Sequence, residues 1–267
     1  MPPRRHIDVD VTNQGALSVE PITASCFRVR LSRDGGAREP ALIRYGILKN
    51  DWPPVAHEFV DDDQAARIRT ADAEITISKA DGRIRLNNAA GETLTYETGA
   101  PRSQTAEGFS VEYALADGEK LYGLGDETRE TIQKRGHLAR MWVANVACYV
   151  PIPFLMSRRG WAIFVNTTWR HSWDVGHSLP DRLRVFGPQG ELDYYLFVGR
   201  DLPALLEQYT ALAGRPHLLP YWGYGFTFVC NQQANAREML DDALNMRREG
   251  IPCDLIGLEP GWMEKHY

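Results

Sequence analysis

Short runs in which apolar and polar residues alternate recur along the chain as far as residue 198, and this pattern most limits what the chain can fold into. Apolar side chains at every second position, between turn residues, are typical of strands that bury one face. The runs lie at residues 26–31, 73–77, 83–86, 93–96, 160–165, 183–186 and 192–198. No strong helical pattern interrupts them, so we predict a mainly β architecture and, within it, a β-sandwich.

Two turn signals join neighbouring runs of this series. Asp81 and Gly82 lie between the second and third runs, and the segment from Asn87 to Gly91 repeats the punctuation before the fourth. Asp-Gly is a strong hairpin signal because both residues tolerate a positive φ. We therefore expect successive antiparallel hairpins in this part of the chain.

The pattern changes near residue 201, where a helix is predicted over residues 201–214. Asp201 can cap its first turn, Pro203 suits an early helical position, and Gly214 can stop it. A connector that contains two prolines, residues 215–220, follows the helix. Such punctuation indicates a domain boundary.

Beyond the connector the pattern is strand, helix, strand. Residues 222–229 form a nearly continuous apolar and aromatic run, as in a strand buried on both faces. Residues 235–249 predict a helix, with Asn235 as its cap, and residues 253–258 predict a second buried strand. Together they fit one right-handed parallel βαβ unit.

We therefore expect two domains, a β-sandwich over residues 1–215 and the start of a parallel α/β domain over residues 216–267. Two parallel strands and one helix bury too little apolar area to form a stable domain by themselves. Residues 216–267 either pack on the sandwich or begin a longer domain, and we favour the second. The apolar side chains of residues 222–229 and 239–246 would then be exposed in this chain alone.

Charge and composition exclude several classes of protein. The chain carries 30 basic and 35 acidic side chains, a net charge of -5, which argues against binding to nucleic acid or an anionic membrane surface. No run of about 18 apolar residues is present to span a membrane. The first residues include basic side chains but no apolar segment after them. No signal peptide is predicted, and a cytoplasmic protein is expected.

No metal or cofactor site is predicted. The chain has four cysteines, at Cys26, Cys148, Cys230 and Cys253. They form no C-x-x-C pair, so we expect reduced, buried thiols. The histidines show no H-x-x-x-H or H-E-x-x-H spacing, so none is expected to bind a metal.

Several other residues could have either a functional or a structural role, and a structural role is favoured for each. The three histidines concerned are His137, His171 and His177, and the three tryptophans are Trp161, Trp169 and Trp173. The tryptophans are expected to pack in the core and on hairpins rather than to form a ligand-binding surface. Residues 121–127 contain two glycines but no G-x-G-x-x-G, which favours a tight turn over a nucleotide site. Asp126 and Glu127 are then expected to bond local backbone.

Candidate binding residues follow the two predicted parallel strands, because chemistry gathers at the C-terminal ends of such strands. Asn231 follows the first strand, and Glu259 and Trp262 follow the second. A carboxylate can accept hydrogen bonds from sugar hydroxyls, and an indole face can cover the C–H face of a pyranose. The alternative for Glu259 is a solvated loop acid.

Five segments in order resemble glycoside hydrolase family 31, the α-glucosidase and α-xylosidase family. Residues 122–126 (YGLGD) look like its Y-G-L-G-E turn, and 153–157 (PFLMS) with 160–165 (GWAIFV) look like its P-F-x-x-S and G-Y-G-x-F hairpin. Residues 214–225 (GRPHLLPYWGYG) are similar to its G-R-P-x-L-P-P-x-W-x-x-G segment, and 248–256 (REGIPCDLI) to R-x-x-x-I-P-x-D-V-I.

The resemblance implies a mutarotase-like β-sandwich followed by the first βαβ unit of a (β/α)₈ TIM barrel. It implies a retaining hydrolase of α-glycosidic bonds with two catalytic carboxylates about 5 Å apart. In the family both follow later barrel strands, so no catalytic residue is expected in these 267 residues, and the chain alone is expected to be inactive.

The resemblance implies that some residues of this chain contact the substrate. Glu259 matches the family's Asp after the second strand, and Asn145, close to Trp142, falls where many members have an Asp on a sandwich loop over the active site. Asn in place of Asp removes a charge and adds two donors, so a hydroxyl pattern different from that of glucose is expected. The alternatives are a non-catalytic carbohydrate-binding sandwich and a mutarotase-like epimerase, which would need a His acid and a carboxylate base.

Overall fold

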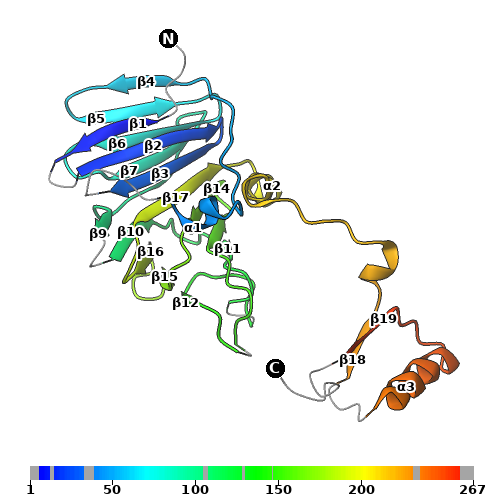
Figure 1. Cartoon of the computed structure of the whole chain (residues 1–267). Helices are drawn as coiled ribbons and strands as arrows, with labels where there is room; N and C mark the ends of the chain where they lie inside the picture. Colours follow the sequence, from blue (N-terminus) through cyan, green and yellow to red (C-terminus); the bar gives the residue numbers. More distant parts are fainter. Residues whose placement is uncertain are drawn as a thin grey trace. The chain divides into compact units, whose positions relative to one another are not determined.

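The computed structural model describes residues 6–12, 15–32, 39–104, 108–127, 130–145, 147–230 and 235–258. The chain divides into two compact units, Met1–Gly214 and Arg215–Tyr267, which are described separately below. Strands dominate the first unit, whereas the second contains two strands and one longer helix among its described residues (Figure 1).

The largest sheet of the first unit has seven strands, and every neighbouring pair in it is antiparallel. Its order is β1 (Ile7–Val11), β2 (Gly15–Thr23), β3 (Cys26–Ser32), β17 (Leu192–Val198), β14 (Trp161–Val165), β13 (Phe154–Ser157) and β11 (Leu121–Gly123). The pairing of β3 with β17 therefore joins the beginning of the unit to its end (Figure 1).

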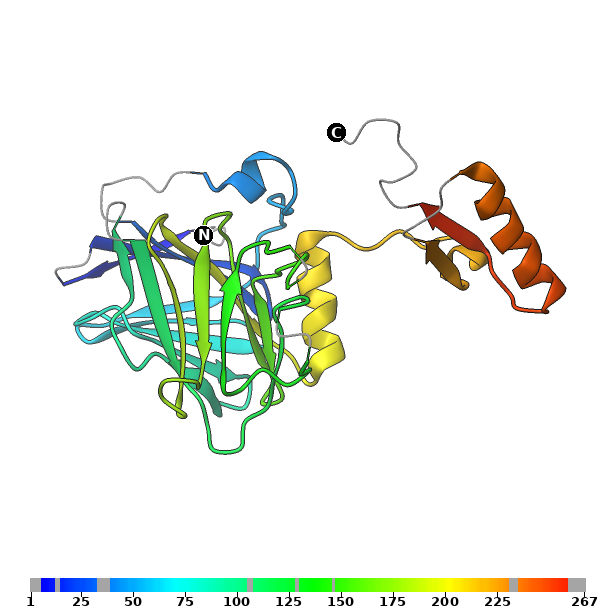
Figure 2. The same ribbon diagram turned by 90° about the horizontal axis from the view of Figure 1, so that it is seen from below.

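Two five-stranded antiparallel sheets complete the first unit (Figure 2). One has the order β12 (His137–Met141), β15 (His171–Val175), β16 (Arg182–Gly187), β10 (Gly108–Ala114) and β9 (Arg102–Gln104). The other has the order β4 (Glu58–Asp61), β5 (Ala65–Arg69), β6 (Ala73–Ser78), β7 (Ile84–Asn88) and β8 (Thr93–Tyr96). An isolated antiparallel bridge between Glu97 and Tyr113 brings the two sheets together.

The predicted strands and hairpins of the first unit are confirmed. Each of the seven alternating runs lies in a strand to within one residue, and β6, β7 and β8 pair as successive antiparallel hairpins. Gly82 and Gly91, in the two turns, have φ values of 73° and 81°, as the turn signals require.

Strand β17 shows how the sandwich uses both faces of its large sheet. Leu192, Tyr194 and Leu196 belong to the main core, which includes residues of all three sheets. The intervening Tyr195 and Phe197 belong to a second apolar cluster on the other face. Successive side chains of a strand point to opposite faces, so β17 is buried on both.

Two helices contribute to the second cluster. The short α1 (Ala41–Arg44) adds Ile43, and α2 (Leu202–Ala213) adds Leu205 and Leu212. The ring of Tyr209 on α2 stacks on Phe154 with their centroids 4.2 Å apart. Helix α2 therefore belongs to the first unit as a cover for its outer face.

The predicted signals of α2 are confirmed. The Asp201 carboxylate accepts a hydrogen bond from Ala204 N at 2.8 Å, which satisfies one of the free N–H groups of the first turn. Gly214 follows the last helical residue with a φ of 98°, a value that glycine adopts readily.

The second unit has a strand, helix, strand order. Strands β18 (Thr227–Cys230) and β19 (Leu255–Leu258) pair in parallel, with α3 (Ala236–Arg248) between them in the sequence. As predicted, Asn235 caps this helix, because its Oδ1 accepts from the backbone N–H groups of Arg237 and Glu238.

The prediction of a continuous strand from residue 222 is wrong. A single 3₁₀ turn, η1 (Tyr221–Tyr224), comes first, and the strand begins only at Thr227. Gly223 N donates to Pro220 O at 2.8 Å, and Gly225 N donates to Trp222 O at 3.1 Å. These two bonds close the 3₁₀ turn, which separates residues 221–224 from the strand.

Large apolar side chains of the second unit are exposed, as predicted for residues 222–229 and 239–246. The affected residues include Trp222, Tyr224, Val229, Leu240 and Leu244. In the described part of the chain, no helix is long and apolar enough to cross a lipid bilayer.

The thiols and indoles follow the sequence predictions in most cases. Cys26 and Cys148 are buried and free, and Cys253 is free and partly buried. Trp161 and Trp173 are fully buried in the main core, as predicted. Trp169 lies outside the core, against Gly190 of the turn before β17, and about half of its surface (52%) is exposed.

Candidate functional site

The sequence-predicted binding residues fall into two groups. Trp142 and Asn145 lie in the connection between β12 and β13, within the first unit. Asn231, Glu259 and Trp262 lie outside the described residues. A site shared by the two groups therefore stays a prediction. The contacts of the loop that carries Trp142 and Asn145 are described below.

The end of this connection lies against the turn after β11, where Asp126 N donates to Val150 O. Leu124 and Gly125 both have a φ of 65°, and Leu124 N donates to Phe154 O at 2.9 Å. A Cβ at Gly125 would collide with the carbonyl oxygen of Val150. Only glycine lets the two backbones approach so closely, so the turn and the end of the 142–150 loop lie side by side.

Asp126 fastens the loop to this turn. Its carboxylate accepts hydrogen bonds from Tyr149 N at 2.9 Å, Val150 N at 2.8 Å and Cys148 Sγ at 3.1 Å. The expectation that Asp126 bonds backbone is confirmed. The expectation that the bonds are local is wrong, because Tyr149 and Val150 are 23 and 24 residues away.

Neighbouring bonds tie the segment between β11 and β12 to the same place. Glu127 Oε1 accepts from Arg140 N at 3.1 Å. Lys134 Nζ donates to the carbonyl oxygens of Glu127 at 2.7 Å and Thr131 at 2.8 Å. Burial lowers the pKa of Lys134, so it serves as a hydrogen-bond donor to backbone in a partly desolvated position.

Cys148 acts as a packing residue and a hydrogen-bond donor. Burial, with further contributions from the Asp126 and Glu127 carboxylates, raises the pKa of its thiol to about 12. The thiolate is the form that attacks electrophiles and binds metals, so this thiol has little capacity for either. Among the described residues no group of three His, Cys, Asp or Glu side chains could hold a metal ion.

The tip of the loop presents an amide beside aromatic rings. Ala144 and Cys148 exchange two backbone hydrogen bonds of 2.8 Å, which close the tip. Asn145 Oδ1 accepts from the Tyr149 hydroxyl at 2.9 Å. Trp142 and Tyr149 are each about half exposed. This arrangement offers N–H donors and apolar ring faces to a polyhydroxylated ligand.

The histidines have structural partners, which agrees with the role predicted for them. His171 is buried, and its Nδ1 lies 2.8 Å from Trp169 O. Burial lowers the pKa of His171 to about 4, so it is neutral at physiological pH. His137 Nε2 bonds Thr131 Oγ1 at 3.0 Å, and His177 Nδ1 bonds Gly136 O at 3.1 Å.

The first unit is thus a large antiparallel β-sandwich in which α2 covers the outer face of the seven-stranded sheet. The family profile described as the glycosyl hydrolase 31 N-terminal galactose mutarotase-like domain matches residues 16–174. The chain belongs to this family.

Curated relatives and solved structures agree with this family. The chain is 27% identical over 203 residues to an alpha-xylosidase of Emericella nidulans, covering 70% of the chain and 26% of the relative. It is 32% identical over 208 residues to an alpha-glucosidase of Hordeum vulgare, covering 73% of the chain and 23% of the relative. A GH31 dextranase of Flavobacterium johnsoniae, solved with isomaltotriose, has the same fold, with a TM-score of 0.84 and 21% identity over 97% of this chain and 33% of that one. The chain thus spans about a quarter of the two curated relatives.

Replacing Asp126 with alanine should release the 142–150 loop while the sandwich stays folded. Three donors would lose their acceptor, which we expect to raise the opening equilibrium of the loop by about 10- to 100-fold, or about 1–3 kcal/mol. Hydrogen exchange at the amides of Tyr149 and Val150 measures this change. Glu127→Gln is the matched control, because that side chain accepts one backbone bond; equal protection in both variants would contradict the clamp.

Proposed function

We propose that these 267 residues form the N-terminal part of a retaining glycoside hydrolase that acts on α-glycosidic bonds. The observation that carries the proposal is the family match over residues 16–174, which covers more than half of the chain. Relatives of similar sequence are named as an alpha-xylosidase and alpha-glucosidases, which gives the substrate class.

In this proposal residues 216–267 begin a (β/α)₈ barrel. The parallel pairing of β18 with β19 around α3 supports it, since this is the repeating unit of such barrels. The exposed apolar side chains on these elements also support it, because further strands and helices would cover them. The nucleophile and the acid–base residue would then follow later strands, outside these residues.

The 142–150 loop would contribute to sugar recognition. Trp142 would cover a pyranose face, and Asn145 would donate amide N–H groups to hydroxyl oxygens while Tyr149 holds its Oδ1. Glu259, with Trp262 and Asn231, would bind further hydroxyls from the barrel side. The Asp126 clamp supports this role, because a fixed loop loses less conformational entropy when it binds a ligand.

The test compares this chain with a longer one that continues it through a complete barrel. We expect the longer chain to hydrolyse 4-nitrophenyl α-glucoside or α-xyloside with retention of the anomeric configuration, and residues 1–267 to release no nitrophenol. In the longer chain Asn145→Ala should lower kcat/KM by about 10- to 100-fold, the cost of one or two lost hydrogen bonds in the transition state.

Tyr96→Ala is the matched control in the same assay, because this exposed ring lies on β8, in a sheet that neither end of the 142–150 loop joins. Hydrolysis by the 267-residue chain would refute the placement of the catalytic pair. A longer chain that binds these glycosides without turnover would refute the hydrolase and favour a carbohydrate-binding module.

A further inference from the structure

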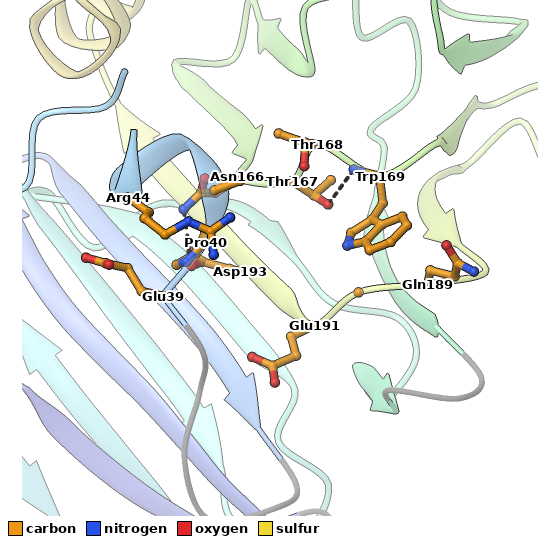
Figure 3. A pocket seen from close by; sticks show the side chains of 12 residues that line it. Glu39, Pro40, Arg44, Asn166, Thr167, Thr168, Trp169, Gln189, Glu191 and Asp193 are labelled. Carbon is orange, nitrogen blue, oxygen red and sulfur yellow. Dashed lines mark hydrogen bonds between the residues drawn. The ribbon is translucent and has the colours of Figure 1, made fainter. Parts of the chain in front are cut away.

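A pocket of about 480 Å³ lies in the first unit, outside the loop that the proposed function uses (Figure 3). Three stretches that are distant in sequence line it: residues 39–44, which include α1, the segment after β14 at 166–169, and the turn before β17 at 189–193. No residue of the 142–150 loop is among the residues that line it. A volume of this size suits a small ligand.

Trp169 forms the aromatic wall of the pocket. Its indole is about half exposed. The ring stands against Gly190, where an added Cβ would come within 2.9 Å of Cδ1. Trp169 N donates to Thr167 Oγ1 at 3.1 Å, and Trp169 O bonds His171 Nδ1 at 2.8 Å. An exposed ring on a fixed backbone is a preorganised stacking surface.

Asn166 supplies a polar group to the inner wall. It is 2% exposed, and its Nδ2 donates to Asp193 Oδ2 at 3.2 Å. This bond fixes the orientation of the amide, because the reversed amide would set two oxygens against each other. Asn166 Oδ1 is left buried with no hydrogen-bond partner in the part of the chain that the structure describes. A donor is therefore needed here, and a hydroxyl group can supply one.

The charges around the pocket disfavour an anionic ligand. Arg28 and Arg30 already neutralise Asp193, with contacts of 2.6 and 3.4 Å. Of the other charged residues that line the pocket, Glu39 and Glu191 are acidic and Arg44 is basic (Figure 3). Together these residues carry three positive and three negative charges, so no net positive charge is left to attract phosphate or carboxylate ligands.

We propose that this pocket is a second, non-catalytic binding site for a neutral sugar. A pyranose ring would stack on Trp169, and its hydroxyls would donate to Asn166 Oδ1 and to the carboxylates at the rim. The site requires no turnover, so it does not depend on the proposed hydrolase activity. Its place on the sandwich would let the protein hold a saccharide chain while the catalytic site acts elsewhere.

Fluorine NMR of the 267-residue chain carrying 5-fluorotryptophan tests the site. Methyl α-glucopyranoside, methyl α-xylopyranoside, maltotriose and inorganic phosphate are the probes. We expect the Trp169 resonance, assigned from Trp169→Phe, to shift saturably with at least one sugar, with a Kd on the order of 1 mM, and not to shift with phosphate. The Trp169 variants lack this resonance, so their sugar binding is measured by titration calorimetry. Trp169→Ala should weaken binding at least about tenfold, whereas Trp142→Ala should leave the saturable shift of the Trp169 resonance unchanged.

The outcomes separate this site from the proposed function. No saturable shift up to about 50 mM of any sugar would overturn the proposal. Binding that survives Trp169→Ala but not Trp142→Ala would assign the sugar to the loop instead, and tighter binding of phosphate would refute the neutral ligand. Trp169→Phe keeps an aromatic face, so an affinity between those of the parent and Trp169→Ala would show that stacking matters. Unchanged fluorine resonances of the other tryptophans would show that both variants are folded.

Discussion

Replacing Asp193 with alanine is expected to lower the free energy of unfolding by about 3–5 kcal/mol, because a buried cation would lose its partner. Arg28 Nε and Nη2 donate to the two carboxylate oxygens of Asp193 at 3.0 and 2.6 Å. Both side chains are almost fully buried. Arg30 adds a third contact at 3.4 Å, so one carboxylate balances two guanidinium groups.

No other group near Arg28 would fully balance its charge after Asp193 is removed. Burial opposes the charge on Arg28, but the hydrogen bonds and charge of Asp193 outweigh this effect and raise its pKa. Glu20 also acts on Arg28, but its effect is weaker than that of Asp193. An arginine cannot shed its charge at any ordinary pH, so the variant must bury a poorly paired cation or open the pairing of β3 with β17.

Urea unfolding followed by circular dichroism measures the loss. Asp61→Asn is the matched control, because it breaks an exposed pair with Lys79 of similar length, 2.7 Å, and should barely move the midpoint. Adding Arg28→Met to Asp193→Ala should recover part of the loss by removing the unpaired charge. If Asp193→Ala alone is as stable as Asp61→Asn, the buried pair does not stabilise the sandwich.

This pair also shows which part of the fold the sequence could predict. The run at 192–198 predicts a strand, and the strand is there. Its period predicts that Asp193 shares a face with Tyr195 and Phe197, but not that this face is covered. The second apolar cluster buries that face. Arg28, which donates hydrogen bonds to the Asp193 carboxylate, is 165 residues away in sequence. Strand formation is local, whereas burial depends on the tertiary fold.

The candidate sites divide in the same way. Trp142 and Asn145 were predicted from their motif context, but the Asp126 clamp that holds their loop joins residues more than 20 positions apart. Trp161 and Trp169 are chemically identical, yet one is core and the other exposed. Trp169 follows a strand end and stands on Gly190 of another turn, and no local pattern reports such a neighbour.

The second large effect is on pH dependence: the stability conferred by Glu97 should fall as the pH rises from about 4.5 towards 8. The Glu97 carboxyl is buried where β8 approaches β10. It contacts Ile84 N at 2.8 Å and the Tyr194 hydroxyl at 3.0 Å, and that hydroxyl lies 3.0 Å from the Tyr113 hydroxyl. Burial raises the pKa of Glu97 to about 8, although these bonds act in the opposite direction.

The sign follows from where the proton is bound. Between the unfolded pKa, near 4.5, and the folded pKa, about 8, the folded chain holds a proton that the unfolded chain has released. Raising the pH therefore favours unfolding throughout this window. Below it both states are protonated and the contribution of Glu97 is fully present, and above it the loss is complete. The loss amounts to up to about 5 kcal/mol.

Glu97→Gln should remove this pH dependence while keeping the shape of the site. The oxygen of the introduced amide can accept from Ile84 N, and its nitrogen can donate to Tyr194, whose hydroxyl then turns towards Tyr113. We expect similar stabilities of variant and parent at pH 5, and a variant more stable by about 2–4 kcal/mol at pH 8.5, measured by urea unfolding at each pH.

Glu112→Gln provides a control of opposite sign on the neighbouring strand. Burial tends to raise the pKa of Glu112, but the bonds from Thr98 and Arg182 outweigh it and lower the pKa. Its ionised form is therefore the stabilising one, and the stability it confers is lost as the pH falls through its folded pKa. Glu112→Gln should accordingly be less stable than the parent at pH 7 and similar at pH 3. If Glu97→Gln and the parent instead lose stability in parallel between pH 5 and 8.5, the proton is not held by Glu97, and the Tyr113–Tyr194 pair must accommodate a buried carboxylate.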